Sequence, residues 1–241
     1  MAVKPVRWKN ETFRIAYDIV HPDASKDLIV LHGWGSDKEL MKQAFATAFP
    51  DWRHIYIDLP GFGKSSNDTV LKTEDYAAIV ETFLESIGAK KDAAVGHSFG
   101  GKVATLLNPE RLVLLSSAGI VLPKPLKIRA KIALFKLLKP FGGKKLRRLF
   151  ASKDAADMPP HMYETFKNVV DEDFTDRFAA YTRPALLCWG AEDTATPPEA
   201  GETIAKAMPR AELILFDGDH YFFLKNPRAV ISKMEAFLET V

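Results

Sequence analysis

The stretch Gly96-His97-Ser98-Phe99-Gly100-Gly101 decides the fold, because it places a serine between glycines where two predicted elements meet. The apolar run Ala93-Ala94-Val95 precedes it and predicts a strand, and the helix-compatible run from Lys102 to Leu107 follows it. A serine on so tight a turn takes a strained backbone conformation, so its neighbours two residues away must be small. This context predicts a strand–turn–helix elbow that exposes the Ser98 hydroxyl. The same short pattern also occurs in plain glycine-rich turns, so the rest of the chain must distinguish the two.

Length and composition are those of an ordinary soluble domain. The chain has 241 residues, of which 47% are hydrophobic and 27% charged, with a net charge of +2. So small a charge implies no nucleic-acid partner, and the single cysteine, Cys188, excludes an intrachain disulfide. Neither a signal-peptide pattern nor an apolar run of membrane-spanning length occurs, so we expect a cytoplasmic protein without a membrane span.

Apolar runs alternate with helical patterns along most of the chain. A starting hairpin is expected from Val6–Trp8 and Thr12–Val20, and Thr73 is expected to cap a helix. This alternation predicts a parallel α/β architecture. Further strands are expected at Leu28–Leu31, His54–Asp58, Leu112–Leu115, Ala185–Trp189 and Glu212–Phe216, and further helices at Glu39–Thr47, Thr73–Ile87, Pro198–Met208 and Pro227–Leu238.

The alternation stops between residues 120 and 180. This segment contains no clear buried strand, has a helical character and is punctuated by prolines. The simplest interpretation is one α/β core, formed by residues 1–119 and 181–241, with a helical insertion at residues 120–180.

Three chemistry-bearing residues follow predicted strands. Because the carboxyl ends of parallel strands meet at one edge of a sheet, Ser98, Asp193 and His220 are expected to lie together. A serine hydroxyl is a poor nucleophile and needs a base such as His220 to take its proton. The imidazole in turn needs a carboxylate such as Asp193, which selects its tautomer and stabilises the imidazolium. The set predicts acyl-transfer chemistry.

With these residues the chain resembles the α/β-hydrolase superfamily, in its branch of capped serine esterases and C–C hydrolases, from about Leu28 to its end. The resemblance implies a mostly parallel central sheet flanked by helices, with residues 120–180 as a helical cap inserted after the sixth strand. The order Ser98, Asp193, His220 is the nucleophile–acid–histidine order of these enzymes. The matching stretches are His32-Gly33-Trp34-Gly35, Asp58-Leu59-Pro60-Gly61-Phe62-Gly63-Lys64-Ser65, Gly96 to Gly101, Trp189-Gly190-Ala191-Glu192-Asp193 and Gly218-Asp219-His220.

An oxyanion hole needs two backbone N–H donors near the developing negative charge. Phe99, directly after the nucleophile, supplies one donor, and the family pattern places the second on Trp34. The glycines on either side of Trp34 let that backbone approach closely, and its side chain would line the pocket. Further residues expected at the substrate pocket are His32, which would support the oxyanion loop, Gly33, His97 and Tyr221.

Two other carboxylates compete for the imidazole. Asp217 and Asp219 lie close to the histidine in sequence, but adjacency rarely gives the required geometry, so Asp193 is favoured. Some hydrolases use an acid after the sixth strand, where this chain has Ser116 and Ser117. No His, Cys or carboxylate spacing is typical of a metal site and no phosphate-binding loop occurs, so neither a metal nor an organic cofactor is expected.

The predicted insertion carries a basic pattern. Between Leu112 and Lys153 there is no Asp or Glu, while lysines and arginines interleave with apolar residues. Such a pattern is typical of a membrane surface, an acidic partner or an anionic small-molecule substrate. Equally, it fits a cap whose apolar face covers the site while its lysines are solvated. The pattern does not choose among these, and oligomeric state stays open.

A serine nucleophile excludes the halide-displacing and epoxide-opening relatives, which use aspartate. We expect hydrolysis of a small-molecule carboxylic ester, thioester or lactone through an acyl-enzyme. The alternative is a C–C bond hydrolase acting on a 2-hydroxy-6-oxo-dienoate ring-cleavage product. Those enzymes usually have Asn at the position of His97 and Trp at that of Tyr221, which argues against it. An alternative of another class, a catalytically silent binding protein, is disfavoured because all three residues of the triad are present.

Overall fold

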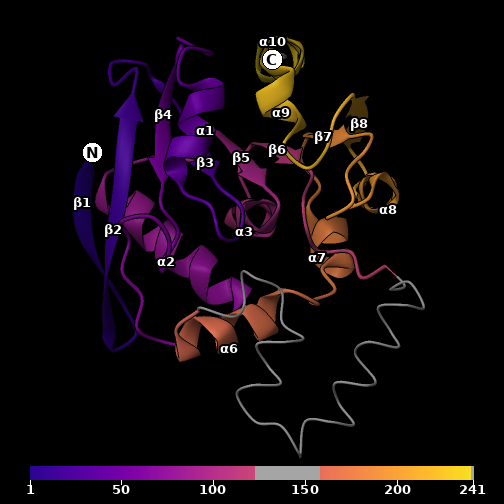
Figure 1. Cartoon of the computed structure of the whole chain (residues 1–241). Coiled ribbons are helices and arrows are strands. Elements are labelled where there is room, and N and C mark those ends of the chain that lie inside the picture. The colour runs from indigo at the N-terminus through magenta and orange to yellow at the C-terminus, as the bar shows by residue number, and fades with distance from the viewer. Residues whose placement is uncertain (123–157, 240–241) are drawn as a thin grey trace, which may run out of the picture.

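A central β-sheet organises the described part of the chain, residues 1–122 and 158–239, in the computed structural model (Figure 1). Its eight strands within these residues follow the order β1-β2-β4-β3-β5-β6-β7-β8. The first two pairings, β1 with β2 and β2 with β4, are antiparallel, and all pairings from β4 to β8 are parallel. The expected hairpin and mostly parallel sheet are confirmed. The strands are β1 Ala2–Trp8, β2 Glu11–Val20, β3 Lys26–Leu31, β4 Trp52–Ile57, β5 Ala93–His97, β6 Arg111–Leu115, β7 Ala185–Gly190 and β8 Ala211–Phe216.

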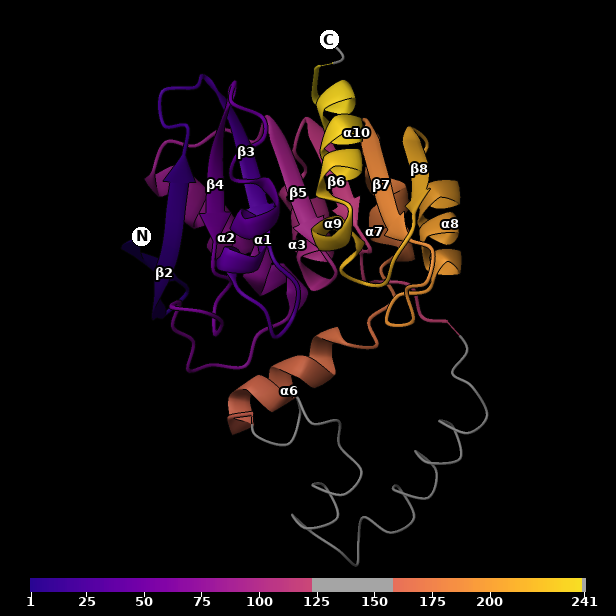
Figure 2. The ribbon, with the colours of Figure 1, turned by 45° about the horizontal axis from the view of Figure 1, so that its top comes forward.

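Helices cover both faces of the sheet, because its middle strands are apolar on both sides (Figure 2). In β3, Ile29 and Leu31 pack into a core with α2, α3 and α8, while Leu28 and Val30 pack on the other face with α1, α9 and α10. None of the helices in the described ranges has the length and apolarity needed to cross a bilayer. The helices are α1 Lys38–Phe45, α2 Thr73–Ser86, α3 Phe99–Leu107, α6 Pro160–Val169, α7 Thr175–Ala180, α8 Pro198–Ala207, α9 Phe222–Lys225 and α10 Pro227–Glu239.

The start of α2 differs from the prediction. Thr73 is the first helical residue rather than the cap, and Lys72 precedes the helix in an extended conformation. The Asp75 carboxylate accepts the Lys72 N–H at 3.0 Å, so an acid three residues on does part of the work expected of the threonine. The Thr73 hydroxyl instead donates to Glu172 Oε2 at 2.5 Å. The Thr73 side chain, which the sequence predicted as the helix cap, therefore makes a long-range contact with Glu172 instead.

Between β6 and β7 the chain leaves the sheet, as the sequence predicts. Its described residues form α6 and α7, which agree with the helical character expected there. The basic segment from Lys124 to Lys153 lies outside the described residues, and the bounds of the cap stay a prediction. The four-residue helix α9, which begins two residues after His220, was not expected, since so short an element leaves no periodic pattern.

Candidate active site

The elbow is built by close backbone contacts that only glycine permits. Ser98 joins β5 to α3 with φ 52° and ψ −117°, a strained conformation for a residue with a side chain. A Cβ atom at Gly96 would lie 2.4 Å from the carbonyl oxygen of Gly100. A Cβ at Gly100 would lie 2.5 Å from the carbonyl oxygen of His32. The strand–turn–helix context predicted for Ser98 is therefore present, pressed against the turn that follows β3.

A buried carboxylate holds the imidazole of His220. His220 Nδ1 lies 2.8 Å from Asp193 Oδ2, and Asp193 is 3% exposed. Burial alone would raise the pKa of Asp193, but hydrogen bonds from His220 and the Thr196 backbone N–H outweigh it and lower the pKa to about 2. An ionised carboxylate only accepts hydrogen bonds, so Nδ1 carries the proton and Nε2 is left as the base.

Thr196 completes this arrangement and was missed by the sequence interpretation. Its Oγ1 lies 2.9 Å from Asp193 Oδ2 and 3.2 Å from His220 Nδ1. The other carboxylate oxygen, Asp193 Oδ1, accepts the backbone N–H groups of Ala195 and Thr196 at 2.8 and 2.9 Å. An aspartate followed after two residues by a threonine is a turn signal that would have indicated this contact.

The contacts recorded for the competing acids do not involve the imidazole. Asp219 Oδ2 accepts the Lys225 ammonium at 2.7 Å, and its Oδ1 accepts the Tyr221 N–H at 3.0 Å. Asp217 contributes a backbone carbonyl, which accepts from Asn226 Nδ2 at 2.8 Å. The structure thus brings Asp193, and not its rivals, to the imidazole.

His97 connects the elbow to His220. Ser98 and His220 both lie in the described part of the chain, and no hydrogen bond joins their side chains. In enzymes without substrate, hydrogen bonds between catalytic residues are often long or absent. His97 Nε2 donates to the backbone oxygen of His220 at 3.1 Å, and the two rings have centroids 4.6 Å apart. Burial lowers the pKa of His97 to about 3, which keeps the ring neutral. The residue before the serine therefore positions the loop that carries the histidine.

The turn after β3 lies against the elbow. A Cβ at Gly33 would lie 3.1 Å from Ser98 Cβ and 3.0 Å from His97 Nδ1, so a side chain there would force the loop away. The Trp34 and Phe99 rings pack edge to face, with centroids 5.5 Å apart. Phe99 is the first residue of α3, where backbone N–H groups have no partner within the helix.

His32 holds this turn in place. Its Nδ1 donates to the Gly33 carbonyl oxygen at 2.8 Å, and its Nε2 accepts the Leu59 N–H at 3.0 Å. A backbone N–H can only donate, so His32 is the neutral tautomer with the proton on Nδ1. Burial lowers its pKa in agreement with this state. His32 thus joins the turn after β3 to the loop after β4.

A cavity of about 420 Å³, lined mostly by residues with apolar side chains, opens beside the turn. Trp34 and Tyr221 line it, whereas His32, Gly33 and His97 are buried and are not among its lining residues. The described lining carries no charged side chain. Apolar residues bear no chemical signature in a sequence, so most of this wall was not predicted. The lining residues are Trp34, Gly35, Gly61, Phe62, Met158, Pro159, Met162 and Tyr221.

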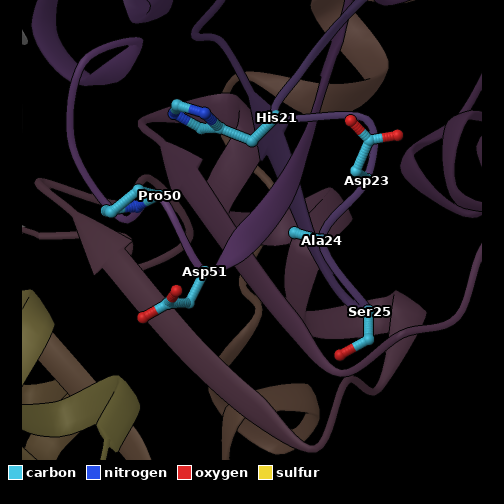
Figure 3. Close-up of a pocket in the computed structure, with 6 residues that line it drawn as sticks. All are labelled: His21, Asp23, Ala24, Ser25, Pro50 and Asp51. Carbon is cyan, nitrogen blue, oxygen red and sulfur yellow. The ribbon is translucent and has the colours of Figure 1, made fainter.

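A second cavity lies at the opposite edge of the sheet, and Figure 3 shows the residues that line it. Pro50 and Asp51 precede β4, so this cavity is at the amino end of that strand, away from the elbow. The cavity measures about 540 Å³ and is lined by His21, Asp23, Ala24, Ser25, Pro50 and Asp51.

Within residues 1–122 and 158–239, no group of three or more His, Cys, Asp or Glu side chains is placed to hold a metal ion.

Comparison with known proteins places this geometry in a family. Residues 28–233 match the model of the alpha/beta hydrolase family. The chain belongs to this family. It is therefore a hydrolase.

Its relatives are distant. A pimeloyl-[acyl-carrier protein] methyl ester esterase of Vibrio vulnificus is 24% identical over 88% of this chain and 93% of its own length. A 2-hydroxy-6-oxononadienedioate/2-hydroxy-6-oxononatrienedioate hydrolase of Dechloromonas aromatica is 26% identical over 77% of this chain and 74% of its own. Among solved structures, an esterase from Exiguobacterium antarcticum superposes with a TM-score of 0.74 at 20% identity, covering 95% of this chain and 96% of that one. The last likeness concerns the fold alone.

Proposed function

We propose that this alpha/beta hydrolase cleaves a carboxylic ester, thioester or lactone of a small molecule through an acyl-enzyme on Ser98. The observation that carries the proposal is the 2.8 Å contact between His220 Nδ1 and the buried Asp193, next to a serine held on a strained elbow. This pair leaves His220 Nε2 as a base on the side of the catalytic edge. The methyl ester esterase among the relatives supports the same reaction class.

The reaction proceeds in two halves. His220 Nε2 takes the Ser98 proton as Oγ attacks the carbonyl carbon, and the N–H groups of Phe99 and Trp34 stabilise the oxyanion. The imidazolium, stabilised by Asp193, then gives its proton to the leaving alcohol, thiol or lactone oxygen. In the second half, His220 deprotonates a water that attacks the acyl carbon and releases the acid, restoring the Ser98 hydroxyl. Residues 120–180 act as the cap over this site in our proposal, supported by the 5.4 Å approach of the Phe166 and Trp34 rings.

A second candidate, C–C bond hydrolysis of a dienoate ring-cleavage product, is favoured by the relative from Dechloromonas aromatica. Such a substrate carries a carboxylate, and the described lining of the 420 Å³ cavity offers no cation to pair with it. His97 and Tyr221 also stand where those enzymes usually have Asn and Trp. Ester hydrolysis therefore remains the better-supported function.

Substitution of the nucleophile tests the proposal. Ser98→Ala is expected to lower turnover about a millionfold and to abolish labelling by a fluorophosphonate probe, because no other group can form the acyl-enzyme. The measurement is labelling of wild type and variant, followed by a panel of p-nitrophenyl esters run beside a dienoate substrate. Equal labelling of both proteins would refute the serine mechanism. Activity on the dienoate alone would favour the second candidate, and labelling with no turnover of any ester would favour a binding protein.

A further inference from the structure

A buried lysine on the helix that begins at the elbow has no part in the reaction described above. Lys102, on α3, is 1% exposed. Its Nζ donates to the Val169 carbonyl oxygen at 2.6 Å and to Glu172 Oε2 at 2.7 Å. The same ammonium lies 5.5 Å from the ring centroids of Phe99 and Phe174. All these partners other than Phe99 come from the chain that returns between β6 and β7.

Such a pair is a costly way to hold two segments together. Burial lowers the pKa of Lys102, and the hydrogen bond and charge of Glu172 oppose that shift. Apolar residues of similar volume often stabilise a fold as well as a buried ion pair does, or better. What an ion pair adds is a specific relative placement, because an ammonium displaced from its acceptors is left buried and unpaired. The pair thus points to a need for accurate placement of the returning chain.

The element that is placed is α6, which Figure 2 shows lying below the sheet. Val169 is its last residue, and Glu172 follows shortly after. Glu172 Oε2 also accepts the Thr73 hydroxyl at 2.5 Å, which attaches the same carboxylate to the start of α2. One turn before Val169 in α6, Thr165 Oγ1 accepts the Leu71 N–H at 3.0 Å. The carboxyl end of α6 is therefore fixed to both α3 and α2.

The same buried face of α6 also reaches the cavity beside the turn after β3. The Phe166 ring packs against Trp34 at 5.4 Å. Met162 lines the 420 Å³ cavity and accepts a hydrogen bond from Asn67 Nδ2 at 3.4 Å. A Cβ on Gly61 would lie only 2.6 Å from Met162 Sδ, so the helix already lies in contact with the opposite wall. A small shift of α6 would change the space that an apolar group can fill.

We propose that Lys102 and Glu172 are a positioning pair that fixes α6 as one wall of an apolar acyl pocket and thereby sets acyl-chain preference. The inference rests on the proposed esterase function for its kinetic part. In the proposed acyl-enzyme the acyl group is bonded to Ser98 Oγ. Because the turn that carries Trp34 packs against Ser98, we assign the cavity beside Trp34 to the acyl chain. Neither residue of the pair touches the reacting atoms.

The chain offers a matched control for this pair. In Lys102–Glu172 the side chains are 1% and 22% exposed, and in Asp27–Arg53 they are 4% and 24% exposed. Asp27 and Arg53 lie at the amino ends of β3 and β4, away from the site. Glu172→Leu and Arg53→Met each remove the more exposed partner and leave a buried charge. Both variants are expected to lose stability, which thermal unfolding measures.

Two measurements separate placement from stability. The first is the ratio of kcat/KM for p-nitrophenyl octanoate to that for the acetate, and the second is the Kd of octan-1-ol by calorimetry, which needs no chemistry. For Glu172→Leu we expect the ratio to fall about tenfold and the Kd to rise about tenfold, whereas Arg53→Met keeps the wild-type values of both. Glu172→Gln, which keeps an oxygen acceptor for Lys102, is expected to fall between wild type and Glu172→Leu.

A charge-free variant keeps the test decisive if a single variant fails to fold. Lys102→Met combined with Glu172→Leu removes both charges, so it is expected to recover stability while the Kd stays raised. Wild-type values in that double variant, or equal changes in Arg53→Met, would overturn the positioning role, as would a wild type that does not bind octan-1-ol. If the wild type hydrolyses no ester, yet its octan-1-ol Kd differs from those of the variants as expected, the esterase function is rejected and the role of α6 as a pocket wall is retained.

Discussion

At the scale of single residues, the proton on His220 Nδ1 determines what Ser98 can do. Asp193 accepts a hydrogen bond from this N–H with one oxygen, while its other oxygen accepts the N–H groups of Ala195 and Thr196. In Asp193→Asn, those two N–H groups would retain the amide oxygen and turn the NH₂ towards His220. Nδ1 would then have to accept, leaving the proton on Nε2, where it blocks proton transfer from Ser98. We expect turnover to fall about ten-thousandfold, measured on a p-nitrophenyl ester.

The neighbouring acid provides the control for this substitution. Asp219 is adjacent to His220 in sequence but binds the Lys225 ammonium at 2.7 Å. Asp219→Asn should therefore lower turnover less than about tenfold, as expected for loss of an exposed ion pair. If Asp219→Asn proved as damaging as Asp193→Asn, the assignment of the acid would be wrong.

Residue chemistry explains which parts of the site the sequence could predict. Ser98, Asp193 and His220 were selected because few residue types supply a nucleophile, an acid and a base after strands. Thr196 and Met162 were missed, since threonine and methionine are common residue types and only their position in the fold shows that they belong to the site. Lys102 was missed for the same reason. Its partner Glu172 lies far along the chain, and nothing local connects them.

At the scale of elements, the turn after β3 packs closely against the elbow. A methyl group on Gly33 would lie 3.0 Å from His97 Nδ1 and 3.1 Å from Ser98 Cβ, so the turn would have to withdraw. Gly33→Ala is expected to move the Trp34 N–H away from the oxyanion and to lower kcat about a hundredfold. Steady-state kinetics on a short ester measure this effect, and circular dichroism checks that the variant is folded.

A glycine far from the site separates clash from strain. Gly88 follows α2 with φ +63°, and a Cβ there would meet nothing within 4 Å. Gly88→Ala should cost about 1 kcal/mol of stability through backbone strain while kcat stays at the wild-type value. A loss of kcat in Gly33→Ala no larger than in Gly88→Ala would show that the close approach is not needed for catalysis.

Elements with strong local signals were the ones predicted. Buried strands such as β3 and β7 appear as continuous apolar runs, and their positions agree with the structure within about two residues. The start of α2 was predicted with the wrong cap, because Thr73 contacts Glu172 of the returning chain. The helix α9 gave no signal, since its start depends on the turn that carries His220. Tertiary contacts outweighed local propensity in both cases.

At the scale of the whole molecule, three histidines are buried and neutral in three different places. His32 lies in the turn after β3, His54 in β4 and His97 at the end of β5, and each is at most 1% exposed. Burial lowers the pKa of all three, to about 4 for His54 and about 3 for His97. Folding therefore keeps protons off these rings in a pH range where the unfolded chain binds them.

This difference predicts acid sensitivity with a definite sign. Below the unfolded pKa of 6.5 and above the folded values, the unfolded state binds more protons, so the free energy of unfolding falls as pH falls. Each histidine contributes up to about 1.4 kcal/mol per pH unit in that window. His54→Gln, remote from the elbow, should therefore lose about 2 kcal/mol less than wild type between about pH 7.5 and pH 5. Urea unfolding followed by circular dichroism at both pH values measures this, and equal losses in both proteins would show that His54 is protonated in the folded state.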